Sequence, residues 1–189
     1  MSLIANIFKE HLSAVDTLRG QEDRIFRLGN ILIERLHAGG RILLCGNGGS
    51  AADAQHIATE LTCRFEINRR ALPAIALTTD TSMLTACGND LGFDRIFSRQ
   101  IEAIATSEDV LVGISTSGQS ANVINAVIAA RQRGTLTVGL LGRDGGAMHE
   151  LVDHGITVGV NSTARIQECH ILIGHIWCAM IDAAFTDAN

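Results

Sequence analysis

The sequence is poor in the residues that mark domain boundaries. Its 189 residues contain one proline, Pro73, and no run rich in proline, glycine and serine that would separate two domains. Internal repeats and low-complexity segments are also missing. We therefore expect one domain over residues 1–189, and 47% hydrophobic residues are enough to give it a substantial core.

Paired cysteines and long apolar runs are missing as well. The five cysteines are odd in number and have no CxxC pair, which argues against a disulfide framework or a thiolate zinc site and favours a reducing cytoplasm. The N-terminus lacks a positively charged head and an apolar core, so no signal peptide is expected. The longest apolar stretch, 171–185, is interrupted by His175 and Asp182 and is shorter than the roughly 20 residues of a membrane span.

Positive charge is scarce too. Fifteen lysines and arginines stand against twenty aspartates and glutamates, which gives a net charge of -5. No basic run could neutralise a phosphate backbone. Neither nucleic acid nor a membrane is therefore expected as a direct partner.

The sequence does contain a regular alternation of helix-like and strand-like segments. Apolar residues at helical spacing before and after Gly20 predict two helices within about residues 1–37. Short apolar runs predict strands at 41–45, 73–79, 109–115, 136–142 and 155–160. Helix-compatible segments follow at 50–62, 94–105, 120–133, 146–152 and 164–185. Because such strands are typical of parallel sheets covered on both faces, the sequence predicts an α/β fold, a doubly wound five-stranded parallel sheet flanked by helices, with flavodoxin-like topology.

Two loops after predicted strands have the chemistry of anion sites. GNGGS at 46–50 lets backbone N–H groups approach a ligand closely and opens a helix whose N-terminus favours negative charge. STSGQS at 115–120 supplies four hydroxyls before another helix, enough donors to surround the terminal oxygens of a phosphate monoester. Because ligands of open parallel sheets bind beyond the carboxyl ends of the strands, we place a phosphate group at the second loop.

The glycine loop alone is ambiguous. Such turns often serve only to connect a strand tightly to a helix. Gly46, Gly48 and Ala51 also satisfy a loose dinucleotide-binding pattern, but the next strand lacks an acidic residue at the offset that a ribose contact requires. A Walker-type phosphate loop is excluded because no Gly-Lys-Ser or Gly-Lys-Thr follows the glycines.

Polar groups on two predicted helices form a second set of candidates. His56 and Glu60 are four residues apart and share one helix face, as a surface hydrogen-bonded pair also would. Gln167, His170 and His175 interrupt an otherwise apolar helix, where each buried polar group needs a partner. A carboxylate, imidazoles and an amide oxygen could hold a divalent ion such as zinc, or the carboxylate and an imidazole could shuttle protons.

Four stretches together resemble the phosphoheptose isomerases of the sugar isomerase (SIS) domain family: 46–60, GNDLGF at 88–93, STSGQSANV at 115–123, and 165–175 with its RIQECH. The resemblance runs from about residue 37 to residue 185. It implies a cytoplasmic homotetramer that interconverts D-sedoheptulose 7-phosphate and D-glycero-D-manno-heptose 7-phosphate through a cis-enediol. This reaction is the first step of bacterial surface heptose biosynthesis, and the family commonly binds zinc.

The resemblance also implies roles for individual residues. Glu60 would be the general base and His175 the general acid of the proton transfer between C1 and C2. The implied metal ligands are His56, Glu60, Gln167 and His175. The implied substrate contacts are Asn47, Gly48, Gly49, Asn89, Asp90, Ser115, Thr116, Ser117, Ser120 and Gln167.

Two relatives without this activity are the alternatives. Ala164 stands where some family members carry an acidic residue, and a similar Ala-Arg-Ile-Gln run occurs in a noncatalytic SIS scaffold that binds the bacterial replication initiator. That relative lacks the carboxylate at the position of Glu60, so Glu60 and His175 favour the enzyme. A sugar-phosphate-sensing SIS domain would normally be joined to a DNA-binding module, for which 189 residues without a basic segment leave no room.

Helix geometry favours active sites shared between subunits. Gln167 and His175 are about 12 Å apart along a helix axis, whereas metal–ligand bonds measure only about 2.0 to 2.2 Å. Either the helix begins irregularly near Gln167 or the two residues come from different copies of the chain. The second option is favoured because the apolar surface of this helix exceeds what one sheet face needs. We therefore expect Glu60 and His175 to enter one site from different chains.

Overall fold

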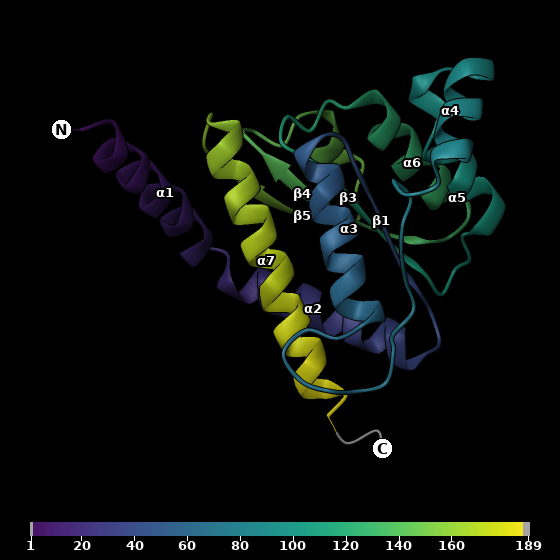
Figure 1. Ribbon diagram of the computed structural model, residues 1–189, viewed down its shortest axis with the longest axis horizontal. Coiled ribbons are helices and arrows are strands. Elements are labelled where there is room, and N and C mark those ends of the chain that lie inside the picture. The colour runs from purple at the N-terminus through teal and green to yellow at the C-terminus, as the bar shows by residue number, and fades with distance from the viewer. Residues whose placement is uncertain (1, 187–189) are drawn as a thin grey trace.

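The computed structural model describes residues 2–186, and Figure 1 shows their arrangement. Two helices come first, α1 (Leu3–Arg19) and α2 (Glu22–His37). The strands are β1 (Ile42–Gly46), β2 (Ala74–Ala76), β3 (Val110–Ser115), β4 (Leu136–Gly142) and β5 (His154–Val158). The other helices are α3 (Gly49–Thr62), α4 (Thr81–Asp90), α5 (Ser98–Ile104), α6 (Ala121–Gln132) and α7 (Thr163–Ala184), with 3-10 turns η1 (Phe93–Arg95) and η2 (Ala147–Glu150).

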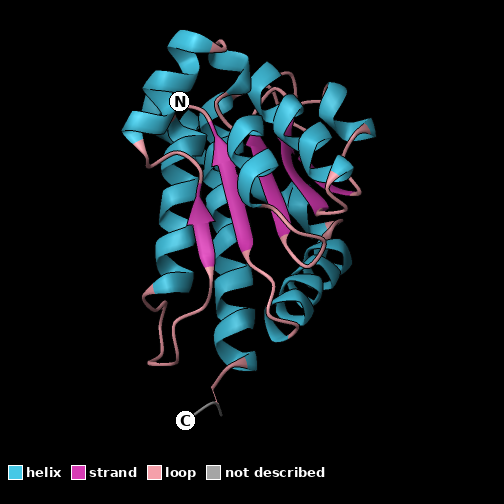
Figure 2. Ribbon diagram, turned by 90° about the vertical axis from the view of Figure 1, so that its right-hand side faces the viewer, coloured by secondary structure: helices cyan, strands magenta, loops and turns pink. Residues whose placement is uncertain are grey.

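The five strands form one parallel sheet in the order β2-β1-β3-β4-β5. Figure 2 shows the strands between helices on either side. This order is that of flavodoxin-like folds, so the predicted fold class is confirmed. Gly46 pairs with Ile114, and therefore the loops that follow β1 and β3 leave the sheet side by side.

The core lies on both faces of the sheet because successive strand residues point to opposite sides. Ile42 and Leu44 of β1 pack on the side that α1, α2, α3 and α7 cover. Leu43 and Cys45 pack on the other side, against residues of α4, α5, α6 and η2. β1 and β3 are buried along their whole length, as their apolar sequences predicted.

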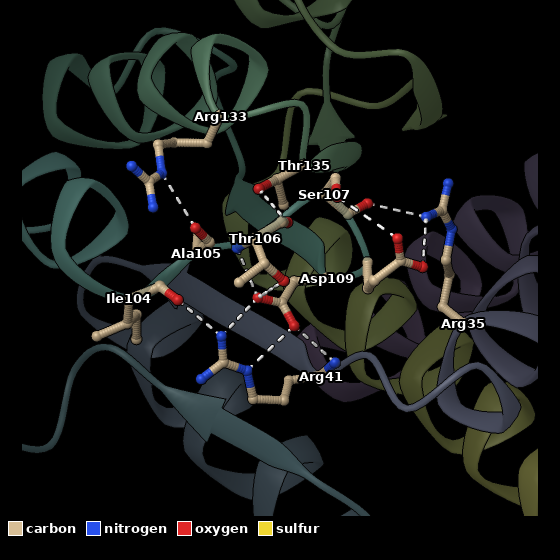
Figure 3. Close-up of polar contacts among 10 residues, drawn as sticks. Arg35, Arg41, Ile104, Ala105, Thr106, Ser107, Asp109, Arg133 and Thr135 are labelled. Atoms are coloured by element: carbon tan, nitrogen blue, oxygen red, sulfur yellow. Dashed lines mark hydrogen bonds and ion pairs between the residues drawn. The ribbon is translucent and has the colours of Figure 1, made fainter.

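The amino ends of β1 and β3 are joined by the polar network in Figure 3. The buried Asp109 carboxylate accepts hydrogen bonds from the backbone and guanidinium of Arg41 and from the backbone and hydroxyl of Thr106. These bonds hold the pKa of Asp109 below its usual range against the opposing effect of burial, which is the largest single influence. The network lies at the end of the sheet opposite the two loops.

Several predicted elements differ in extent. The strand predicted at 73–79 is reduced to Ala74–Ala76, because the chain turns directly after Ala76, where the Thr79 hydroxyl donates to the Ala76 carbonyl. The helix predicted at 94–105 is divided into η1 and α5, and the segment 146–152 contains only the 3-10 turn η2 after two glycines with positive φ. Helix α4 was not predicted; Asp80 caps it, and Cys87 is its only buried residue, so it has little apolar periodicity.

Helix α1 extends away from the rest of the chain in Figure 1. Only Ala14 and Leu18 of this helix are buried. Four large apolar side chains on it are 64% to 75% exposed: Leu3, Ile4, Phe8 and Leu12. None of the helices in residues 2–186 combines the length and the apolar character needed to cross a membrane.

Candidate functional site

The serine loop, residues 115–120, connects the end of β3 to the start of α6. Ser115 Oγ lies 3.0 Å from Ser120 Oγ and accepts a hydrogen bond of 3.1 Å from the backbone of Gly118. Ser120 occupies the N-cap position of α6 but makes no capping hydrogen bond with its side chain. The first N–H groups of α6 therefore keep their capacity to bind an anion, together with the loop hydroxyls.

The glycine loop, residues 46–50, connects β1 to α3. Gly48 has a φ of 57°, which favours glycine, and it stands at the N-cap of α3 without a side-chain cap. Gly49 lies against Gln167 of α7 so closely that a Cβ at this position would collide with the Gln167 amide. The loop thus brings its backbone beside one predicted substrate contact, and only glycine fits there.

Two amide side chains join the glycine loop to the start of α6, directly after the serine loop, and only Asn47 of this pair was predicted as a site residue. Asn47 donates a 2.8 Å hydrogen bond to Asn122, and Asn122 donates one of 2.8 Å in return. Asn122 is 2% exposed and lies in the first turn of α6. Asn122 lies within STSGQSANV at 115–123, a stretch that resembles the family, but its contact with Asn47, 75 residues away, cannot be predicted from that stretch.

The predicted acid and base lie farther along the same helices. His56 Nε2 of α3 is 2.9 Å from His175 Nε2 of α7 and 3.5 Å from Glu60 Oε1. Phe65 stacks on the His175 ring at 5.5 Å between centroids. We call His56, Glu60 and His175 the acid–base cluster, and all three belong to one chain.

A single chain therefore brings Glu60 and His175 to the same cluster, so a second chain is not needed to bring these two residues together; a site shared between subunits stays a prediction. Helices α3 and α7 lie side by side in Figure 1, with Gln167 beside Gly49 and His175 beside His56. Pairing along the whole length of two helices could not be inferred from spacing on α7 alone. Because α7 is α-helical from Thr163 onward, an irregular start near Gln167 is also excluded, and Gln167 stays about 12 Å along the axis from His175.

Two further titratable groups lie on these helices. Burial raises the pKa of Asp53 to about 6, and the nearby His56 opposes this rise. His170 is fully buried, and burial lowers its pKa to about 4. His170 Nε2–H donates a 3.0 Å hydrogen bond to the carbonyl of Leu141, so this histidine fixes α7 to β4 rather than joining the acid–base cluster.

Asn89 and Asp90 are placed at the end of α4 and are exposed. Asn89 Nδ2 donates a 2.7 Å hydrogen bond to Asp90 Oδ1. Within residues 2–186, neither side chain hydrogen-bonds to a predicted site residue outside this pair. Their assignment as substrate contacts stays a prediction.

The acid–base cluster supplies the donor types of a zinc site, two imidazole nitrogens and a carboxylate oxygen. Ligand atoms of tetrahedral zinc stand about 3.3 Å apart, so the 2.9 Å between the imidazole nitrogens is the spacing of a hydrogen-bonded pair. No group of three or more His, Cys, Asp or Glu side chains in residues 2–186 has the arrangement to hold a metal ion as it stands. The donor chemistry fits zinc, and a small opening between the two rings would give the required spacing.

The chain is an α/β protein with a glycine-rich and a hydroxyl-rich loop at the carboxyl ends of two neighbouring parallel strands, and α3 leads from the first of these loops to the acid–base cluster. The family described as SIS domain matches residues 7–142. A phosphoheptose isomerase of Aliarcobacter butzleri is 55% identical over 180 residues, 93% of this chain and 95% of that protein.

Two solved structures of phosphoheptose isomerases are also similar to this chain. A phosphoheptose isomerase from Neisseria gonorrhoeae matches with a TM-score of 0.89 and 46% identity, over 95% of this chain and 97% of that one. One from Francisella tularensis matches with a TM-score of 0.92 and 36% identity, over 97% and 100%. The chain belongs to the SIS domain family and, within it, to the phosphoheptose isomerases.

Proposed function

We propose that this protein is an aldose-ketose isomerase that interconverts D-sedoheptulose 7-phosphate and D-glycero-D-manno-heptose 7-phosphate, at the start of surface heptose biosynthesis. The observation that carries the proposal is the acid–base cluster on α3 and α7, in a chain that also presents the glycine loop before α3 and the serine loop before α6. A sugar isomerase needs both parts, because one holds the phosphate and the other moves protons at the opposite end of the substrate.

In this proposal Glu60 takes the proton from C1 of the ketose and returns it to C2 of the enediol. His175 gives a proton to the carbonyl oxygen and removes one from the neighbouring hydroxyl, so no net proton is gained or lost. His56 contacts both groups and fixes their orientation. The serine loop binds the phosphate dianion through hydroxyl and backbone N–H donors.

The proposal includes one zinc ion per subunit, held by the acid–base cluster with Gln167 as a further ligand. When bound, zinc would act as a Lewis acid at the substrate carbonyl. The support is the donor set described above. Zinc content per subunit in wild type and in a His56→Ala variant tests this part, because loss of an imidazole ligand should lower occupancy.

A homotetramer with shared sites is also part of the proposal. Glu60 lies eleven residues from Gly49, about 16 Å along α3, so the cluster of a single chain is far from its own loops. A neighbouring subunit would bring its loops and Gln167 to this cluster. The exposed apolar face of α1 offers the contact surface, since such faces on soluble proteins are typically covered by partners. Phe8→Glu should lower the mass measured by light scattering.

We place the enzyme in the cytoplasm. All five cysteines are free thiols in the structure, and four of them are buried. Unpaired thiols are typical of reducing compartments. The noncatalytic scaffold is not favoured, because the chain retains Glu60 in contact with His56, and the relatives named above are phosphoheptose isomerases.

Incubation with D-sedoheptulose 7-phosphate, followed by detection of an aldose, tests the activity directly. We expect an aldose phosphate to form with the wild-type protein and not with Glu60→Gln. Unphosphorylated sedoheptulose is the matched control substrate and should react far more slowly. A folded wild-type protein that forms no aldose would overturn the proposal in favour of the scaffold.

A further inference from the structure

Arg143 has an unusual backbone. Its φ is 59°, and it is the one non-glycine residue with positive φ in residues 2–186. This left-handed region is disfavoured for residues other than glycine, asparagine and aspartate. A residue keeps such a backbone where the surrounding structure fixes it, and these positions cluster at functional sites.

The surroundings of Arg143 are the serine loop itself. Residues 142–146, which we call the GRDGG turn, follow β4, and the backbone of this turn packs directly on the serine loop. A Cβ on Gly142 would collide with the Thr116 carbonyl, and a Cβ on Gly118 with the Gly145 carbonyl. The Met148 N–H, just after the turn, donates a 3.0 Å hydrogen bond to the Gly118 carbonyl. These backbone contacts fix the position of Arg143 relative to the proposed phosphate site.

Arg143 and two residues of the serine loop, Ser117 and Gln119, line one cavity. Its volume is about 510 Å³, and its walls are Ser117, Gln119, Arg143, Asp144, Gly159 and Asn161. Arg143 is the only cation among these residues, and it is exposed to the cavity solvent. The only anion, Asp144, already accepts a 3.0 Å hydrogen bond from the Gly146 N–H within the turn. The Arg143 guanidinium is thus the one positively charged group among the residues that line this cavity with Ser117.

We propose that Arg143 is a substrate-binding residue that pairs with the phosphate dianion held at the serine loop. The inference rests on the proposed function, since it assigns a further ligand to the same phosphate. The hydroxyl and N–H donors of the loop are neutral, and a dianion gains additional binding from one charged partner. The cost of the left-handed backbone at Arg143 is then offset by substrate affinity.

Three variants test this inference. Arg143→Ala removes the charge, Arg143→Lys keeps it, and Arg143→Gly removes the charge while relieving the backbone. We expect the alanine and glycine variants to raise KM about tenfold, with little change in kcat, because a charge-assisted contact is lost. Lysine should recover part of the affinity. The glycine variant should melt no lower than wild type, which separates loss of a ligand from loss of structure.

The matched control is Arg27→Ala, which removes an exposed arginine from α2 outside this cavity and should leave KM unchanged. Calorimetric titration with inorganic phosphate provides a readout besides turnover. We expect weaker phosphate binding in Arg143→Ala than in wild type and in Arg27→Ala.

The outcomes separate this inference from the proposed function. A wild-type protein without isomerase activity contradicts the function, and the phosphate titration still decides on Arg143. Equal KM in wild type and Arg143→Ala overturns the inference while leaving the function in place. Phosphate binding that is equal in both, or undetectable in both, overturns it as well.

Discussion

His56 Nε2 and His175 Nε2 lie 2.9 Å apart in a single chain. The contact depends on the parallel packing of α3 against α7, which a buried ion pair fixes at the far end of both helices. Arg69 donates 2.8 Å hydrogen bonds to Asp182 of α7 and to the backbone carbonyl of Glu60. One subunit thus brings the three residues of the acid–base cluster together, whereas the glycine loop lies at the other end of α3, beside the serine loop proposed to bind phosphate.

The distance between the acid–base cluster and the loops of the same chain leads to a prediction about mixtures of two variants in the proposed tetramer. If the loops and Gln167 of one subunit meet the cluster of another, mixing Glu60→Gln with Gln167→Ala should restore activity. Some sites would then combine an intact cluster from one chain with intact loops from the other. Mixing Glu60→Gln with His175→Ala should restore none, because both changes damage the cluster.

The readout is isomerase activity after subunit exchange has been verified by mass spectrometry of differently tagged chains. Recovery in the second mixture would show that Glu60 and His175 act from different chains. No recovery in the first mixture would mean that Gln167 serves the site of its own chain.

Glu60→Gln should lower kcat by at least about a hundredfold, since general-base catalysis typically contributes that much or more. The amide keeps the shape of the side chain but cannot accept the proton. Glu34→Gln, an exposed change on α2, is the control and should keep full activity. Thermal melting and zinc content must be measured alongside. Near-normal kcat in a folded variant would remove the base assignment from Glu60.

Local sequence chemistry predicted the two loops well. Glycines at 46–49 and hydroxyls at 115–120 are short-range signals of a strand-to-helix turn that binds anions, and both turns form as expected. The burial of β1 and β3 likewise followed from their uninterrupted apolar sequences.

Contacts between residues far apart in the sequence could not be predicted from these short-range patterns. The partner of His175 is set by the packing of α3 on α7, and the partner of Asn47 is an amide 75 residues away. Nothing in the spacing of either stretch specifies those neighbours. Arg143 was overlooked for a related reason, because its left-handed backbone depends on the contact of the GRDGG turn with the serine loop.

The serine loop gives a third prediction. Ser117→Ala and Ser120→Ala should each lower kcat/KM about tenfold or more, mainly through KM, because each removes a hydroxyl donor to a dianion worth roughly 1.5 to 3 kcal/mol. Ser107→Ala, at the amino end of β3, should leave the kinetics unchanged. Steady-state kinetics with D-sedoheptulose 7-phosphate decide this. Normal kinetics in both loop variants would move the phosphate elsewhere, most directly to the glycine loop.

The Asp109 network predicts a change in stability without a change in catalysis. Asp109→Ala should lower the free energy of unfolding by about 3 kcal/mol, since it leaves Arg41 and buried N–H groups of the network without their acceptor. Urea titration measures this effect. Asp16→Ala, which breaks only a surface pair with Arg19, should change stability little. A large change in KM for Asp109→Ala would contradict its structural role, because the network lies at the opposite end of the sheet.

The buried His170 predicts how stability depends on pH. Its pKa is lowered from 6.5 to about 4 in the folded chain, so between these values the unfolded chain binds the extra proton. The contribution is fully present above the unfolded pKa and is lost as pH falls toward the folded pKa. Between about pH 7.5 and about pH 5 the loss should be on the order of 2 kcal/mol.

His170→Gln isolates this contribution, because its amide can still donate to the Leu141 carbonyl but does not titrate. Urea titrations at both pH values should show a smaller acid-induced loss of stability in this variant than in wild type. The carboxylates contribute equally to both proteins and cancel in the comparison. His154→Gln, at an exposed histidine, should behave like wild type. Equal acid sensitivity in wild type and His170→Gln would show that His170 is not held neutral by burial in the folded protein.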